Sequence, residues 1–160
     1  MKRIKINLKK VENQTVNLIA SYFKKGKVVV YPTDTLYGLG CLATCQPAIS
    51  KIYKLKGIKS PKPLIVLIKD FKMLHAFCQV NKTQEKYIRC FWPSTAGKKE
   101  EKKKLPTTFI LRSRGRLPKE ILGQGNSLAV RLPKNDFLTK ILVQVQAPII
   151  STSVNITGQS

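Results

Sequence analysis

Short runs of β-branched and other apolar residues alternate along this chain with segments whose apolar residues recur at helical spacing. Strands interleaved with helices of this length favour a mostly parallel or mixed sheet with helices packed on it. A chain of 160 residues is long enough for one domain with a single core. We therefore expect one α/β domain, with strands at 28–31, 64–68, 107–111, 128–131 and 149–151 and helices at 48–55, 83–92 and 136–145.

The N-terminal part of the chain carries signals for the ends of these elements. Asn13 or Thr15 can cap a first helix, and Gly26 is predicted to end it. Residues 1–10 alternate charged and apolar side chains, which predicts a strand at the edge of the sheet. The same residues contain neither an uninterrupted apolar segment nor a small-residue cleavage site, so no secretory signal is expected.

The net charge of the chain is +22, from 30 Lys and Arg against 8 Asp and Glu. Self-repulsion on this scale is either tolerated by a well-solvated surface or offset by a polyanionic partner, such as a nucleotide, a tRNA or a membrane surface. The apolar runs are too short to cross a bilayer, and the terminus lacks an amphipathic basic stripe. A membrane protein is therefore not expected.

The cysteines indicate a reduced, cytoplasmic protein without a structural metal. None of the four forms a CxxC pair, and the single histidine, His75, does not complete a zinc set of the usual spacing. Four unpaired thiols are typical of a reducing compartment. The four are Cys41, Cys45, Cys78 and Cys90.

Two hydroxyl-rich segments follow predicted strands. Residues 31–40 (YPTDTLYGLG) surround one carboxylate, Asp34, and such a loop is a common way to present side chains to a ligand. In residues 151–158 (STSVNITG), Ser153 and Asn155 are two apart, so an extended backbone turns both toward the same side. Each segment by itself could also serve only to hydrogen-bond its own backbone.

Cationic residues occur in a second kind of segment. Lys56, Lys59 and Lys62 lie in a loop punctuated by glycine and proline, which can aim ammonium groups at phosphates or form a solvated turn. Arg131 interrupts the apolar segment SLAVRLP (127–133), where an unpaired guanidinium would be costly to bury.

We expect Arg131 to meet a carboxylate or a phosphate of a ligand. The alternatives are an internal partner, Asp34 or Asp136, and a strand end that reaches water.

Four segments together resemble motifs of the Sua5/YciO/YrdC family. They are YPTDTLYGLG (31–40), KGIKSPKPL (56–64), SLAVRLP (127–133) and STSVNITG (151–158). The resemblance implies a YrdC-like twisted mixed sheet with flanking helices and a concave basic groove. It also implies that the chain is an L-threonylcarbamoyladenylate synthase, which makes threonylcarbamoyl-AMP and pyrophosphate from L-threonine, bicarbonate or CO2, and ATP. Members of the family do so for the N6-threonylcarbamoyladenosine (t6A) modification of tRNA.

The resemblance assigns roles to individual residues. It implies that Thr33, Thr35, Arg131 and Ser153 bind threonine. It implies that ATP, accompanied by Mg²⁺, is bound by Lys56, Lys59, Lys62, Ser127 and Asn155. Lys56, Ser153 and Asn155 are the residues expected to take part in catalysis. A separate t6A transferase complex is the partner expected downstream.

The chain departs from the family pattern at several places. Ile58 stands where the family has an arginine and Lys59 follows where it has a proline, while Leu67 stands where some members have a histidine. The family's tryptophan motif is split by a basic insertion at 94–105, expected to be a solvated loop or an RNA-contacting arm. Members continue beyond the position of Ser160, so a truncated or compact form, or an impaired activity, is expected. The alternative hypothesis is a non-catalytic RNA-binding protein on the same fold.

Overall fold

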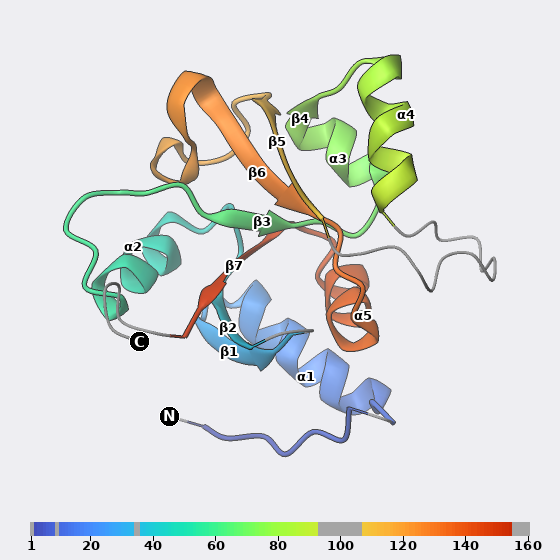
Figure 1. The fold of residues 1–160 in the computed structure, drawn as a ribbon. Helices are drawn as coiled ribbons and strands as arrows, with labels where there is room; N and C mark the ends of the chain where they lie inside the picture. Colours follow the sequence, from blue (N-terminus) through green and yellow to red (C-terminus); the bar gives the residue numbers. More distant parts are fainter. Residues whose placement is uncertain (1, 9, 34–35, 93–106, 155–160) are drawn as a thin grey trace.

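The computed structural model describes residues 2–8, 10–33, 36–92 and 107–154, and a twisted seven-stranded sheet runs through them (Figure 1). The strand order is β1-β2-β7-β3-β6-β5-β4. Only β3 and β6 pair in parallel within this part of the chain, so the expected sheet is mixed rather than mostly parallel. The strands are β1 (Val29–Pro32), β2 (Tyr37–Gly40), β3 (Ile65–Leu67), β4 (Cys78–Gln79), β5 (Thr108–Ser113), β6 (Ser127–Arg131) and β7 (Ile149–Ser153).

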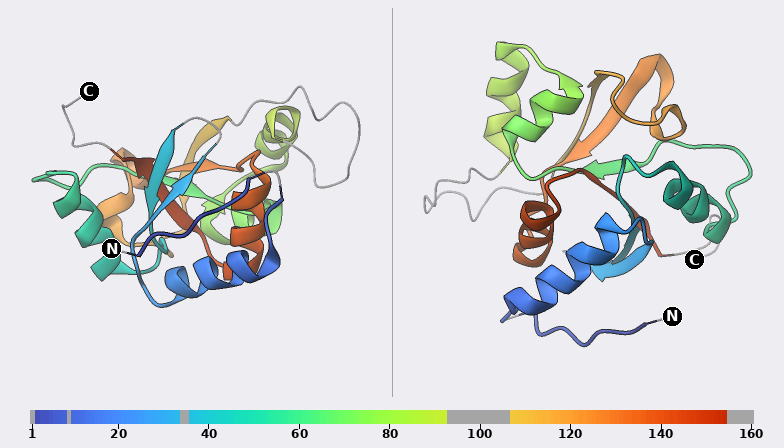
Figure 2. Two further views of the ribbon diagram at one scale, coloured as in Figure 1. Left: turned by 90° about the horizontal axis from the view of Figure 1, so that it is seen from below. Right: turned by 180° about the vertical axis from the view of Figure 1, so that it is seen from behind.

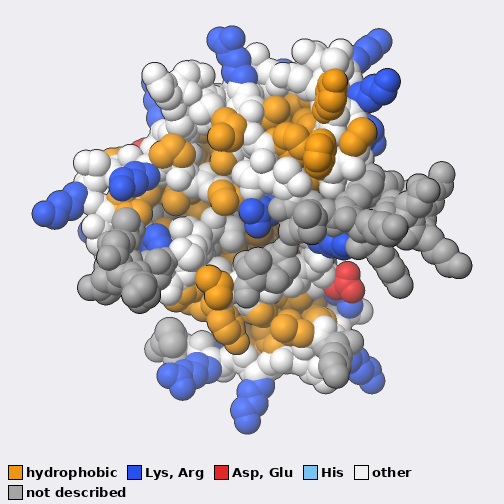
Figure 3. Space-filling model, in the orientation of Figure 1, with side chains coloured by type: hydrophobic (Ala, Val, Ile, Leu, Met, Phe, Trp, Pro, Cys, Tyr) orange, Lys and Arg blue, Asp and Glu red, His pale blue; other side chains and the backbone are white. Residues whose placement is uncertain are grey.

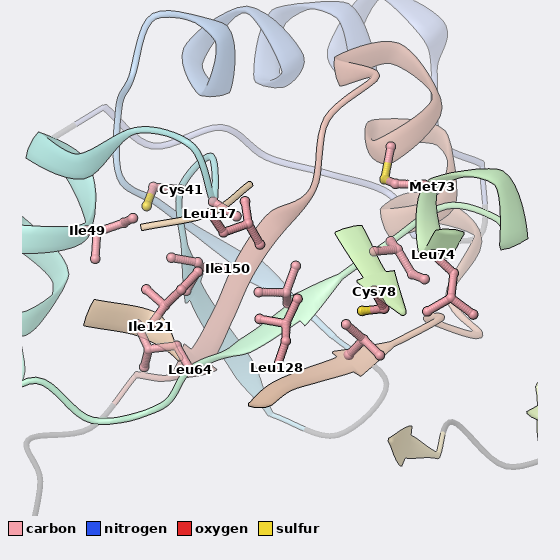
Figure 4. Packing of buried hydrophobic residues seen from close by; sticks show 14 of the residues in the cluster. Cys41, Ile49, Leu64, Met73, Leu74, Cys78, Leu117, Ile121, Leu128 and Ile150 are labelled. Atoms are coloured by element: carbon pink, nitrogen blue, oxygen red, sulfur yellow. The ribbon is translucent and has the colours of Figure 1, made fainter. Parts of the chain in front are cut away.

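Helices cover both faces of the sheet (Figure 2). The helices are α1 (Asn13–Lys24), α2 (Gln46–Leu55), α3 (Phe71–Phe77), α4 (Lys82–Phe91) and α5 (Asp136–Val145), with 3-10 turns η2 (Lys119–Ile121) and η3 (Gln124–Asn126). The apolar stripes of α1 and α5 pack together on one face, against Tyr31, Leu67 and Ile149. On the other face α2, α3 and α4 enclose a larger core that includes Ile150 and Leu128 (Figure 4). The expected α/β domain is therefore confirmed.

The expectation for the N-terminus was wrong. Residues 2–8 and 10–12 form no strand, and their apolar side chains Ile4, Ile6 and Val11 instead pack beside α1 and α5. The alternation of charged and apolar residues therefore belongs to a segment that packs on α1 and α5, not to a strand paired in the sheet. The N-cap of α1 is Glu12, without a side-chain cap hydrogen bond, so neither Asn13 nor Thr15 fills that role.

Two strands, β2 and β4, and the helix α3 lay outside the sequence expectations, as did the 3-10 turns η2 and η3. The strand β2 belongs to the segment that we expected to be a loop, because two of its four residues are glycines. Glycine is needed at both positions because Tyr31 and Ile150 lie too close to the backbone of β2 to leave room for a Cβ. A Cβ on Gly38 would lie 2.9 Å from the Tyr31 ring, and one on Gly40 would lie 2.1 Å from the Ile150 carbonyl oxygen.

The capping box of α4 provides a test of local stability. The Asn81 side chain accepts a hydrogen bond from the Gln84 backbone N–H, and the Gln84 side chain accepts one from the Asn81 N–H. Asn81→Ala should lower the free energy of unfolding by about 1 kcal/mol, because one helix-end donor loses its partner. Urea denaturation would measure the change. Asn17→Ala, at an exposed position inside α1, is the matched control and should cost almost nothing; equal effects would contradict the capping role.

Burial sets the reactivity of the thiols. Burial raises the pKa of Cys41 to about 12 and that of Cys78 to about 11. At pH 8 both thiols should therefore stay protonated and unreactive in the folded protein, since the thiolate is the nucleophile. Titration with a chromogenic disulfide should show rapid reaction at the exposed Cys90 and reaction of Cys41 and Cys78 only after unfolding. Fast labelling of Cys41 in the native state would contradict the packing.

Candidate functional site

A groove of about 390 Å³ lies at the sheet, next to Leu138 of α5. Its floor comes from β2, β3 and β7, which are neighbours in the sheet although they are far apart in the sequence. Arg131 contributes a charged side chain to its lining, and Figure 3 shows Lys and Arg side chains scattered over one face of the molecule. The groove is lined by Thr33, Leu36, Tyr37, Gly38, Pro63, Leu64, Ile65, Leu67, Arg131, Pro133, Leu138, Ser151, Thr152 and Ser153.

The groove brings together three of the four residues expected to bind threonine. Thr33, Arg131 and Ser153 all line it, although up to 120 positions separate them in the sequence. Gly38 pairs with Ser153, so the end of β7 lies beside β2. The strand β3 pairs with β7 on one side and with β6 on the other, and Leu67 of β3 is the partner of Arg131. The fourth residue, Thr35, lies outside the described residues.

Arg131 stands at the end of β6, half-buried at the groove. Its Nε donates a hydrogen bond to Thr108 Oγ1 at 2.8 Å. Within the described part of the chain the guanidinium forms no ion pair, so Asp136 is not its internal partner. The other internal candidate, Asp34, lies outside that part.

Lys56 directly follows α2 and is almost completely buried, with 6% of its surface exposed. Its Nζ donates a hydrogen bond to the backbone carbonyl of Ser153 at 2.8 Å. Desolvation by burial lowers the pKa of this ammonium. Because Ser153 itself lines the groove, Lys56 places a cation directly behind one wall of the groove.

The other two lysines of this segment are exposed and do not line the groove. Lys59 borders a separate hollow of about 180 Å³ beside Tyr53 and Glu120. The Tyr53 hydroxyl lies 2.8 Å from the Lys62 carbonyl and 2.7 Å from the Glu120 carbonyl, which holds the segment against η2. Ile58 is half-buried against the core, so its side chain occupies a packing position.

Ser127, another residue expected to contact ATP, lies beside the groove rather than in it. It is on the same face of β6 as Arg131, because residues 127, 129 and 131 alternate with the buried Leu128 and Val130. A Cβ on Gly123 would lie 2.6 Å from Ser127 Oγ and 3.3 Å from Pro63, a residue of the groove. Ser127 therefore lies near the rim at Pro63. Asn155 lies outside the described residues.

Our sequence reasoning missed several residues of this face. Thr108, Ile110 and Arg112 of β5 pair with Arg131, Ala129 and Ser127, and so extend the groove face along the sheet. Their alternation with Phe109 and Leu111 was the available signal, since a period of two places them on one side. Tyr37 was also missed as a groove residue, and Leu67, which we expected only to mark a departure from the family pattern, is a buried residue of the groove.

Two further properties bear on the chemistry of the site. In the described ranges no three His, Cys, Asp or Glu side chains gather in a way that could hold a metal ion. No helix in those ranges has both the length and the apolar character needed to span a membrane.

Comparison with known proteins identifies the family of the chain. The model of the family Sua5_yciO_yrdC, described as "Telomere recombination", matches residues 21–160. The threonylcarbamoyl-AMP synthase of Pyrococcus abyssi is 30% identical over 151 residues, which cover 94% of this chain and 41% of that protein. The synthase of Neisseria meningitidis (serogroup A) is 33% identical over 143 residues, covering 88% and 70%. This chain thus spans less than half of the first relative and about two thirds of the second.

The fold is also similar to a solved structure. The crystal structure of P. abyssi Sua5 complexed with L-threonine matches with a TM-score of 0.80 at 29% identity, over 94% of this chain and 41% of that one. The family model covers most of the sequence, and the seven-stranded sheet matches the solved fold. The chain therefore belongs to the Sua5/YciO/YrdC family.

Proposed function

We propose that this protein is a threonylcarbamoyl-AMP synthase that uses L-threonine, bicarbonate or CO2, and ATP. The observation that carries the proposal is the meeting of Thr33, Arg131 and Ser153 in one groove, with the buried Lys56 behind it. The names of the relatives support the reaction, and the threonine complex of P. abyssi Sua5 supports the amino-acid substrate.

In the proposed reaction the groove holds threonine by both ends. The Arg131 guanidinium offers a planar fork that matches the α-carboxylate, while Thr33 and Ser153 offer hydroxyls. Thr35 is proposed to complete this set. The unprotonated amine of threonine attacks the carbon of CO2, and the nitrogen then loses a proton to water; alternatively, it attacks bicarbonate and a water molecule leaves. Either route forms a carbamate. A carbamate oxygen then attacks the α-phosphorus of ATP, the bond to the β-phosphate oxygen breaks, and pyrophosphate leaves.

The chain's part in this reaction is to position the substrates and to offset negative charge. We assign the phosphates to Lys56, with Lys59, Lys62, Ser127 and Asn155 as further ATP contacts. The described residues form no carboxylate cage for a resident Mg²⁺. Mg²⁺ therefore fits best as part of the substrate MgATP, because this ion commonly binds through phosphate oxygens and water.

Pyrophosphate release tests the proposal. The purified protein should release pyrophosphate from ATP only when threonine and bicarbonate are both present, and serine or valine should substitute poorly for threonine. Calorimetry with ATP and threonine, singly and together, should show that each increases the affinity for the other. Release that ignores threonine, or binding of neither substrate, would reject the synthase. We propose that the product passes to a separate t6A transferase complex in the cytoplasm.

A specific surface feature favours RNA as a second kind of partner. Arg112, Arg114 and Arg116 are all exposed along one short segment of a chain with net charge +22. Binding to tRNA should weaken steeply as salt rises, because lysines and arginines release counterions from the phosphate backbone. Tight tRNA binding in a protein without threonine-dependent turnover would favour the non-catalytic RNA-binding alternative. Salt-independent binding would contradict a phosphate-backbone interaction.

A further inference from the structure

We propose that Thr108 is a positioning residue whose hydroxyl holds the Arg131 guanidinium in the orientation that receives the α-carboxylate of threonine. This inference rests on the proposed function and assigns a role to a residue of β5 that the family motifs quoted above did not single out for binding. Thr108 itself is not one of the residues that line the groove. Its effect on the substrate is therefore expected to act through Arg131.

The geometry of the sheet brings the two side chains together. Thr108 and Arg131 are direct partners in the antiparallel β5–β6 ladder, so both project from the same face. Thr108 Oγ1 accepts the Arg131 Nε–H bond at 2.8 Å, a charge-assisted hydrogen bond of normal length. Both side chains are half-buried. Water therefore competes less for this hydrogen bond than it would for the same bond between two exposed side chains.

The hydrogen bond uses one donor and leaves the rest of the guanidinium available. In the part of the chain that the structure describes, Nη1 and Nη2 of Arg131 make no hydrogen bond or ion pair. These two nitrogens, rather than Nε, form one edge of the planar fork that can bind a carboxylate bidentately. A bond at Nε therefore restricts the direction of the fork without occupying it.

The surroundings make Thr108 an effective anchor. Its β-branch restricts χ1, so the hydroxyl is held in few orientations. Thr108 stands on β5, which pairs with β6 from Thr108 to Arg112, and β6 in turn pairs with β3 on its other side. The next pair on this face, Ile110 with Ala129, offers no side-chain polar group. A flexible arginine held in its binding orientation before the ligand arrives loses less freedom on binding.

Matched variants test the inference. Thr108→Val keeps the shape and removes the acceptor, and it should raise the KM for threonine about tenfold, the size expected for one charge-assisted hydrogen bond. The KM for ATP should stay within about twofold, because the effect passes only through Arg131. Thr108→Ser restores the acceptor and should return the KM for threonine close to the wild-type value. Thr139→Val, which removes an exposed hydroxyl bonded to the Asn135 carbonyl on α5, is the control and should leave both constants unchanged.

A measurement without substrate examines the same bond. The Arg131 Nε–H signal in a nitrogen–proton NMR spectrum, assigned by its loss in Arg131→Lys, should exchange slowly with water in the wild type. It should exchange rapidly in Thr108→Val and slowly again in Thr108→Ser. An active wild type with unchanged threonine KM in Thr108→Val would overturn this inference alone. A wild type that shows no threonine-dependent turnover would overturn the proposed function and, with it, the assigned role of Thr108.

Discussion

Lys56→Met should reduce threonine- and bicarbonate-dependent pyrophosphate release by at least about a hundredfold, which is the scale of losing one preorganised charge in an active site. Methionine preserves most of the length and apolar surface of the lysine stem but carries no cation. The Lys56 ammonium is buried behind the groove wall at Ser153. Among the described residues, the exposed Lys59 and Lys62 do not supply a cation at that place. Steady-state pyrophosphate assays with saturating ATP would measure the loss.

A neighbouring lysine provides the control for this variant. Lys54→Met removes an exposed charge from the last turn of α2 and should leave turnover within about twofold, since exposed charges contribute little. Circular dichroism should show that both variants remain folded. The Lys56 bond to the Ser153 carbonyl also joins α2 to β7, so a modest decrease in melting temperature is expected. A folded Lys56→Met protein with full turnover would refute the assigned role.

Gly40→Ala should lower the free energy of unfolding by about 3 kcal/mol or more, because the added methyl group overpacks the core. The added Cβ would lie 2.1 Å from the Ile150 carbonyl oxygen and 2.7 Å from the Tyr31 hydroxyl oxygen. The clash cannot be relieved by rotating one side chain, because backbone of β7 is involved. Tyr31 is also buried, and its hydroxyl donates a hydrogen bond to that same Ile150 carbonyl at 3.1 Å.

A second glycine variant serves as the control. Comparing the free energies of unfolding of the two variants in urea distinguishes the clash at Gly40 from the general cost of replacing a glycine. Gly115 has a φ of +71°, and a Cβ added there would meet no atom within 4 Å. Gly115→Ala should therefore cost only about 1 kcal/mol, the penalty of a left-handed backbone. If Gly40→Ala is no more destabilising than Gly115→Ala, the close pairing of β2 with β7 is incorrect. Because Gly38 pairs with Ser153 in the same ladder, displacement of β2 should also impair threonine binding.

The elements that could be predicted are those with strong local signals. The stripe at 136–145 matched α5 at both ends, and the positive φ of Gly26 follows the last residues of α1 as expected. The strand at 37–40 could not be predicted from the sequence, because glycine has a low strand propensity. Glycine is required in this strand because Tyr31 and Ile150 approach it too closely for a Cβ. Residues 1–10 have the alternation of a strand, but among them the described residues 2–8 and 10 pair with no strand of the described sheet.

Local patterns along the chain were enough to identify the α/β class and the family motifs, because side-chain periodicity and turn residues act over a few positions. They could not show that Ile58 packs into the core, that Lys59 borders a different hollow, or that Thr108 holds Arg131. Each of these depends on which strands become neighbours, and strand order is decided by contacts between residues far apart in the chain. Folding is what brings Thr33, Arg131 and Ser153 to a single groove.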